Sequence, residues 1–253
     1  MKKLTVMILS ATLVFSLAAC SSEKEDANQT TQTETSSNKV EESEKSVENK
    51  SSQTVDKVSE NQESVSDEGS ILIAYFSVPE DVDTDGADAI AGASIVVKDG
   101  EKLGNVQYIA QTIQETIGGD LFRIETVQEY PLDHETLVNQ ASDEQAADAR
   151  PELASHIENP EQYDTIILGY PNWWGNMPQP LYTFLEEYDF SGKTIIPFNS
   201  HGGSGFSNTI EEIKELQPDA NISDEGLSIS RDKVADSVQD VTDWAKSLDL
   251  SEK

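Results

Sequence analysis

The stretch TIILGYPNWWGNMPQP, residues 165–180, joins a mostly apolar run to a loop rich in tryptophan and proline. The run at residues 165–170 shows no alternation of apolar and polar residues, which is typical of a strand buried on both faces of a sheet. Comparable runs stand at residues 71–77, 121–125, 193–198 and 222–229. Strands of this kind predict a parallel sheet, whose crossover connections usually contain helices.

Apolar residues between these runs recur at helical spacing. Residues 104–117 carry such a stripe and end at Gly118-Gly119, a helix-stop signal. The same spacing predicts further helices over residues 133–148, 181–187, 206–216 and 232–248. The alternation predicts one α/β domain over residues 70–253, a doubly wound, five-stranded parallel sheet with helices on both faces. Such folds bind ligands beyond the carboxyl ends of the strands, where the strand order reverses.

The chain is strongly acidic, with a formal net charge of −31. Residues 70–253 hold 10 basic and 35 acidic residues, a net charge of −25. Such a surface repels nucleic acid, because that affinity comes largely from Lys and Arg neutralising phosphates. We therefore expect no nucleic-acid partner. The single cysteine, Cys20, excludes an intramolecular disulfide framework and a cysteine-based metal cluster.

Residues 1–19 are expected to be a lipoprotein signal peptide. A Lys2-Lys3 start precedes an apolar run, residues 4–17, that is short for a membrane span. Leu17-Ala18-Ala19-Cys20 resembles the lipobox of bacterial lipoproteins, in which the cysteine is acylated and becomes the mature N-terminus. An ordinary signal peptide with an accidental cysteine, or a buried helix, is the alternative. The lipobox implies an exported protein, held on the outer face of the cell membrane through its lipid anchor alone.

Residues 20–69 are expected to form a disordered linker that starts at lipidated Cys20. They contain no aromatic residue and no proline, so burial cannot offset the entropy cost of ordering them. Valines at loose heptad spacing leave a coiled coil as the alternative, although valine among serine and asparagine makes a poor seam. About 50 flexible residues have a root-mean-square reach on the order of 40 Å, enough to hold a domain off the bilayer.

Two loops at the carboxyl ends of predicted strands have unusual sequences. Residues 171–180 place Trp173 and Trp174 among three prolines, and at least one indole is expected to project outward as a platform for a planar ring. The alternative is that both indoles pack on the neighbouring helix. Residues 199–206 include three glycines, which allow backbone N–H groups to approach a ligand closely.

The loop after the first strand is much longer. Ser77 begins an excursion that returns at Gly104-Asn105-Val106, where the first helix starts. Ser and Asn beside a helix N-terminus form an anion cradle without any basic residue. An anionic group bound here is therefore expected to be held by neutral donors and a helix end.

Together these motifs resemble the flavodoxin-like domain family of bacterial lipoproteins and quinone-reductase-like proteins. The matching segments lie at residues 76–77, 104–106, 169–178, 188–194 and 200–205, and the resemblance spans about residues 70–249. It implies a flavodoxin-like fold and an FMN cofactor. It also implies the binding residues, which are Ser77, Gly104, Asn105 and Val106 for the phosphate; Pro171, Asn172, Trp173, Trp174 and Gly175 along the isoalloxazine ring; and Ser200, His201, Gly202, Gly203, Ser204 and Gly205 on the other side of the ring.

Two features depart from the family pattern. Ordinary flavodoxins close the phosphate loop in a few residues, whereas here residues 78–103 are inserted. Val106 stands where a threonine is usual, so one hydroxyl contact to the phosphate is expected to be missing. The resemblance with these departures implies weaker FMN binding than in a soluble electron carrier, or an insertion that serves as a lid or partner surface.

Other chemistries have weaker support. Residues 81–86 match the opening of a calcium loop, but the twelfth position is Gly92 where a glutamate is needed. Residues 201–203 resemble an esterase oxyanion stretch, but Phe206 stands where a nucleophile elbow needs glycine. The three histidines lack zinc-ligand spacing. We therefore expect neither a metal site nor a hydrolase.

Three functions remain open. The first is a surface-anchored flavoprotein that transfers electrons or reduces quinone-like acceptors, with its electron donor and acceptor unknown. The second is an oxidoreductase that uses NAD(P)H, and the third is a non-redox binding module on a flavodoxin scaffold. No residue is an obvious acid–base catalyst, so the cofactor would do the redox chemistry. The acidic surround is expected to lower the flavin potential, and His201 either tunes the ring or only caps its loop.

Overall fold

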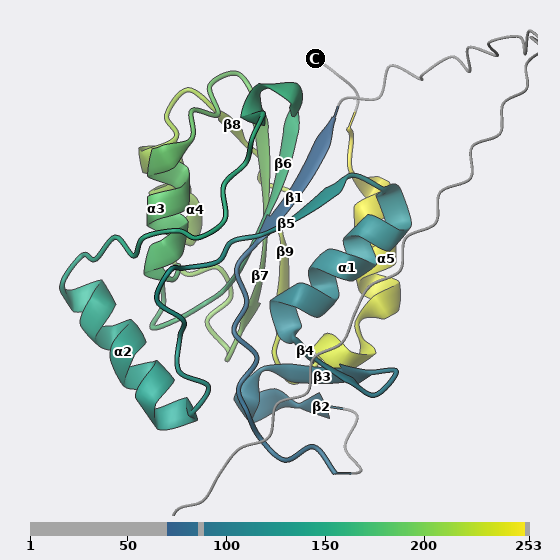
Figure 1. The fold of residues 1–253 in the computed structure, drawn as a ribbon. Coiled ribbons are helices and arrows are strands. Elements are labelled where there is room, and N and C mark those ends of the chain that lie inside the picture. Colours follow the sequence, from purple (N-terminus) through teal and green to yellow (C-terminus); the bar gives the residue numbers. More distant parts are fainter. Residues whose placement is uncertain (1–69, 86–88, 251–253) are drawn as a thin grey trace, which may run out of the picture. The chain divides into compact units, whose positions relative to one another are not determined.

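The computed structural model describes residues 70–85 and 89–250 (Figure 1). The predicted signal peptide (1–19) and linker (20–69), including Cys20, lie outside the described residues. Within the part of the chain that is described, no helix has the length and apolar character to cross a membrane.

A twisted parallel sheet forms the centre of the domain (Figure 1). Its strand order is β5-β1-β6-β7, and both β8 and β9 pair with β7 in parallel at the far edge. The five-position doubly wound sheet that we predicted is therefore confirmed. Its strands are β1 (Ile71–Tyr75), β5 (Asp120–Arg123), β6 (Thr165–Pro171), β7 (Thr194–His201), β8 (Asn221–Ile222) and β9 (Leu227–Ser230).

The fifth predicted strand, residues 222–229, is interrupted. Residues 223–226 leave the ladder opposite Ile196 and Pro197 of β7. Proline has no N–H to donate to a neighbouring strand, and a Cβ on Gly226 would lie 2.8 Å from the Pro197 carbonyl oxygen. The break therefore follows from a residue of the neighbouring strand.

Helices cover both faces of the sheet (Figure 1). Alternate residues of β1 explain why both faces are apolar, because Leu72 and Ala74 belong to one buried cluster while Ile73 and Tyr75 belong to the other. On one face lie α1 (Asn105–Ile117) and α5 (Val238–Ser247). On the other face lie α2 (His134–Ala146), α3 (Gln179–Glu187) and α4 (Thr209–Leu216). Two short 3₁₀ turns are η2 (Pro160–Gln162) and η3 (Val234–Asp236), and Val234 of η3 packs in the cluster that holds α1 and α5.

The insertion at residues 78–103 contains most of a second, antiparallel sheet of order β2-β3-β4. Asp99 and Gly100, both with positive φ, turn the chain from β3 into β4. Ile95, Val96 and Leu103 are buried, and β4 runs directly into α1. The insertion is thus packed against the first helix. Its elements are β2 (Ala89–Ile90), η1 (Ala91–Ala93), β3 (Ile95–Lys98) and β4 (Glu101–Gly104).

Candidate functional site

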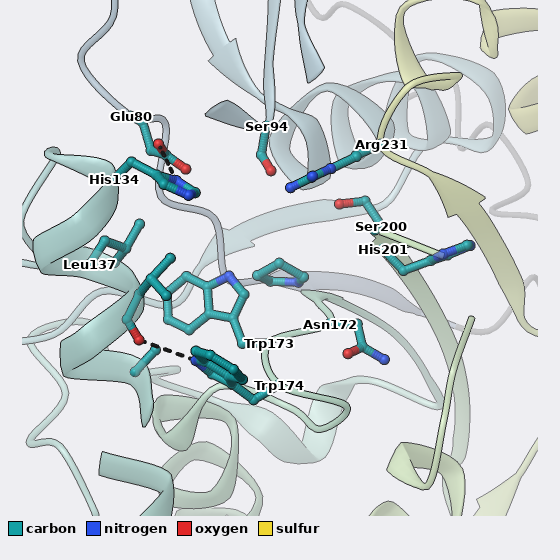
Figure 2. Close-up of a pocket in the computed structure, with 14 residues that line it drawn as sticks. Glu80, Ser94, His134, Leu137, Asn172, Trp173, Trp174, Ser200, His201 and Arg231 are labelled. Atoms are coloured by element: carbon teal, nitrogen blue, oxygen red, sulfur yellow. Dashed lines mark hydrogen bonds and ion pairs between the residues drawn. The ribbon is translucent and has the colours of Figure 1, made fainter. Parts of the chain in front are cut away.

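A cavity of about 170 Å³ opens at the carboxyl edge of the sheet (Figure 2). Its walls include residues 171–174 at the end of β6, residues 200–202 at the end of β7, and one side of α2. A smaller hollow shares several of these lining residues and extends to Ser77, Asn105 and Val106 at the start of α1. The three loops singled out from the sequence therefore meet at one place.

Most of the fifteen predicted binding residues line these two hollows. Five do not, and they shape the loops instead: Gly104, Gly175, Gly203, Ser204 and Gly205. Gly104 shows why a glycine is needed, since a Cβ there would lie 2.2 Å from the hydroxyl oxygen of Ser77. No side chain fits between the two without moving one of them.

The two tryptophans have different environments. Trp173 is partly buried and meets the rings of Phe76 and Tyr130 edge to face, each with a centroid distance of 5.6 Å. Trp174 is 59% exposed and lines the cavity. The prediction that at least one indole projects outward is therefore confirmed, and Trp174 is that residue (Figure 2).

A tight turn holds Trp174 in place. Trp174 and Gly175 have φ values of 55° and 81°, and reciprocal backbone hydrogen bonds between Trp173 and Asn176 close the turn at 2.9 and 3.0 Å. Positive φ at both central residues is the pattern of a type I′ turn. The indole Nε1–H of Trp174 also donates to the carbonyl oxygen of Val138 on α2 at 3.1 Å. The platform is thus fixed at its backbone and at its ring.

Asn172 connects this turn to the glycine loop. Its side-chain amide donates to the Gly205 carbonyl oxygen at 2.9 Å and to the Ser207 hydroxyl at 3.1 Å. Its Oδ1 accepts from the Gly175 amide at 3.0 Å. Asn199 donates to the same Gly205 carbonyl at 2.9 Å. Asn172 therefore sets the spacing between the two loops that face the cavity.

His201 stands at the end of β7 with a defined hydrogen bond. Its Nδ1 accepts from the Gly203 amide at 2.9 Å, so the neutral ring carries its proton on Nε2. Burial lowers the pKa of His201, and nearby Asp232 opposes that shift. The ring is therefore neutral near pH 7, with Nε2–H available as a donor.

The start of α1 differs from the anion cradle predicted from the sequence. The backbone N–H of Asn105 donates to the carbonyl oxygen of Ser94 at 2.8 Å, so the first helical amide already has a partner. Ser94 has a positive φ of 55° and lines both hollows. The side chain of Asn105 is 2% exposed, and its Oδ1 has no hydrogen-bond partner among the described residues. The cradle thus presents an unsatisfied acceptor.

Sequence reasoning missed four polar residues that line the cavity: Glu80, Ser94, His134 and Arg231. Glu80 is 5% exposed and its carboxylate lies 2.9 Å from Nδ1 of His134. Arg231 brings a guanidinium to the cavity, a charged donor that the expectation of neutral donors alone did not include. Arg231 follows β9 and lies two residues beyond the predicted strand at residues 222–229, and that position was the available signal.

Metal binding has no support in the described residues. Among them, no group of three or more His, Cys, Asp or Glu side chains could hold a metal ion. Asp81 of the calcium-like stretch instead pairs with Lys102 at 3.0 Å, and Asp83 accepts from the backbone N–H of Asp85 at 3.0 Å.

Comparison with solved structures found flavoproteins that are similar to this chain. A crystal structure of a candidate flavoprotein from Bacteroides eggerthii DSM 20697 is 26% identical, has a TM-score of 0.52, and covers 71% of this chain and 99% of its own. One from Bacteroides uniformis ATCC 8492 is 28% identical, with a TM-score of 0.49 and coverages of 68% and 98%. A flavoprotein in complex with FMN from Lactobacillus acidophilus NCFM is 19% identical, with a TM-score of 0.44 and coverages of 68% and 99%.

No curated protein sequence matches this chain. The sequence model of the flavodoxin family matches residues 95–247, which is more than half of the chain. That match includes both loops that line the cavity and all but the first strand of the sheet. The chain belongs to the flavodoxin family.

Proposed function

We propose that this protein binds FMN at the carboxyl edge of its sheet and transfers electrons or reduces quinone-like acceptors. The observation that carries the proposal is Trp174, an exposed indole held on a rigid turn in the same cavity as His201 and Gly202. Aromatic platforms of this kind stack on planar rings. The family match and the FMN complex of the Lactobacillus acidophilus neighbour make the flavin ring the planar ligand to test first.

The residues present fit FMN. Asn105 Oδ1 is a buried acceptor without a donor, and the ribityl chain of FMN offers hydroxyl donors. The missing Cβ of Gly104 leaves Ser77 close against the start of α1. Serine hydroxyls at positions 77, 94 and 200 line the adjoining hollow and are suited to polar groups of the ligand. Bound FMN would supply the redox chemistry, while the protein binds and orients it.

The side chains around the cavity have separable roles in this proposal. Trp174 binds the ring, while Trp173 supports its loop from the core. His201 donates a hydrogen bond through Nε2–H, and its low pKa keeps it neutral rather than cationic. The acidic chain disfavours additional negative charge on a reduced cofactor, so we expect a low reduction potential.

FMN titration of the purified full chain tests the proposal. We expect saturable quenching of flavin fluorescence at micromolar or lower FMN. Absence of binding would favour the alternative, a non-redox binding module on this scaffold. One observation points to that alternative, because the Ser94 carbonyl occupies the first amide of α1 and Val106 offers no hydroxyl. If FMN binds, turnover with NADPH would separate an NAD(P)H oxidoreductase from a protein that takes electrons from a membrane donor.

We also propose that the protein is exported and lipid-anchored through Cys20, with residues 20–69 as the tether. The support is the sequence Leu17-Ala18-Ala19-Cys20, with the single cysteine of the chain at the acylated position. Labelled palmitate should be incorporated into the wild-type protein in a bacterial host and not into the Cys20→Ser variant. Equal labelling of both proteins would contradict the anchor.

A further inference from the structure

We infer that Arg231 is the cationic contact for the phosphate of FMN, in place of the purely neutral cradle predicted from the sequence. This inference rests on the proposed function. Arg231 lines the cavity together with Ser94 and Ser200, and Figure 2 shows its guanidinium extending from the end of β9 toward Ser94. A Cβ on Gly202 would lie 3.7 Å from the guanidinium carbon, so the side chain runs along the glycine loop.

The backbone of Arg231 is held at both of its polar groups. Its N–H donates to the carbonyl oxygen of His201 at 2.8 Å. Its carbonyl oxygen accepts a hydrogen bond at 3.4 Å from the side-chain amide of Asn105, and Asn105 is the first residue of α1. The side chain therefore starts beside the helix end where the phosphate is expected. No large loop movement is needed to bring the charge there.

Arg231 differs from the other described arginines in its partners. Arg123 lies 3.7 Å from the carboxylate of Glu125, and Arg150 lies 2.8 Å from both Asp148 and Glu186. Within residues 70–85 and 89–250, no Asp or Glu oxygen lies within 4.0 Å of a side-chain nitrogen of Arg231. Arg231 is exposed and lines the cavity without a carboxylate partner among these residues, so its guanidinium is available to an anionic ligand.

The state of α1 explains why a cation is needed. A phosphate monoester carries a charge of roughly −1.5 to −2 at pH 7. A helix N-terminus binds such an anion through its free amides, but the Asn105 amide already donates to Ser94. Val106 adds no hydroxyl donor. A guanidinium can donate two parallel hydrogen bonds to phosphate, which replaces the lost amide and hydroxyl contacts.

The test compares FMN with riboflavin, which has the same ring and ribityl chain but no phosphate. Both flavins are titrated into full-length wild type, Arg231→Gln and Lys233→Gln. The Lys233 variant is the matched control. Lys233 is two residues from Arg231, and its side chain does not line the cavity, so the variant removes one positive charge nearby but outside the site. We expect Arg231→Gln to weaken FMN binding about 10-fold and riboflavin binding less than about twofold. Lys233→Gln should leave the ratio of the two affinities unchanged.

Two further measurements keep the test decisive. Inorganic phosphate should compete with FMN for wild type and much less for Arg231→Gln, and Arg231→Lys should restore part of the preference for FMN. An unchanged FMN-to-riboflavin ratio in a folded Arg231→Gln protein would overturn the inference and leave FMN binding intact. An equal change in Lys233→Gln would also overturn it, since the effect would then be general electrostatics. A wild-type protein that binds neither flavin would overturn the proposed function, and this inference with it.

Discussion

Replacing Trp174 by alanine separates stacking from folding. Alanine is chosen because Trp174 has a φ of 55°, and glycine at that position would relieve backbone strain and confuse the stability measurement. The variant loses the indole surface and the hydrogen bond from Nε1 to the Val138 carbonyl. Because the side chain is 59% exposed, we expect unfolding free energy to fall by no more than about 1 kcal/mol.

The same variant is also expected to bind FMN more weakly. An aromatic pair contributes about 0.5–1.5 kcal/mol beyond area burial, which corresponds to a loss of FMN affinity of roughly 2- to 13-fold. Trp174→Phe keeps an aromatic face but loses part of the ring surface and the N–H donor, so it should retain more affinity than Trp174→Ala. Both variants are titrated with FMN by fluorescence, and their stability is measured by chemical denaturation.

Trp173→Ala is the contrasting variant. Trp173 packs edge to face on Phe76 and Tyr130, so its removal opens a cavity in the core. We expect it to cost about 3 kcal/mol of unfolding free energy. If Trp174→Ala leaves FMN affinity and flavin quenching unchanged while the protein stays folded, the assignment of Trp174 as the platform is wrong.

Three further predictions use the same domain. Gly104→Ala should lower unfolding free energy by about 1–3 kcal/mol, because its Cβ would lie 2.2 Å from the Ser77 hydroxyl; Ser77→Ala in the same chain should recover part of that loss, and strict additivity in a double-mutant cycle would contradict the contact. Asn172→Ala should cost about 1–3 kcal/mol and weaken flavin binding, since it removes the hydrogen bonds to Gly205, Ser207 and Gly175; denaturant unfolding gives the first quantity, and an unchanged midpoint would refute the clamp. The pKa of His201 is lowered in the folded protein, so the neutral ring stabilises the fold above the unfolded pKa near 6.5, and this stabilisation is lost as pH falls through the folded pKa. The thermal midpoint of wild type should therefore drop more steeply than that of His201→Gln between pH 7.5 and 5.5. Parallel curves for the two proteins would contradict the pKa shift.

The fold was predictable because the central strands β1, β6 and β7 are largely buried. Residues 71–77 and 165–170 are apolar without alternation, and each packs against helices on both sides of the sheet. The interruption between β8 and β9 was not predictable from residues 222–229. Its cause is Pro197, which belongs to another strand and faces the break only after the sheet has formed.

The insertion was only partly readable. Asp99-Gly100 is a hairpin signal that directly follows the short strand at residues 95–98, and the structure uses it as a turn. The small sheet that results could have been expected from that dipeptide. What the local sequence does not contain is the contact of Ser94 with α1, because that contact depends on how β3 and β4 pair.

That pairing connects the insertion to Arg231. Since β3 pairs with β4 and β4 continues into α1, the residue before β3 is brought to the first turn of the helix, and its carbonyl takes the Asn105 amide. The Asn105 side chain, now beside β9, donates to the Arg231 carbonyl, a contact between residues 126 positions apart in the chain. Because the insertion already pairs the first amide of α1, we infer that phosphate binding falls to Arg231, a residue distant in the sequence that lies beside Asn105 in the fold. Shortening the insertion to free the Asn105 amide should therefore make FMN binding less dependent on Arg231, and an undiminished dependence in such a folded variant would separate the two features.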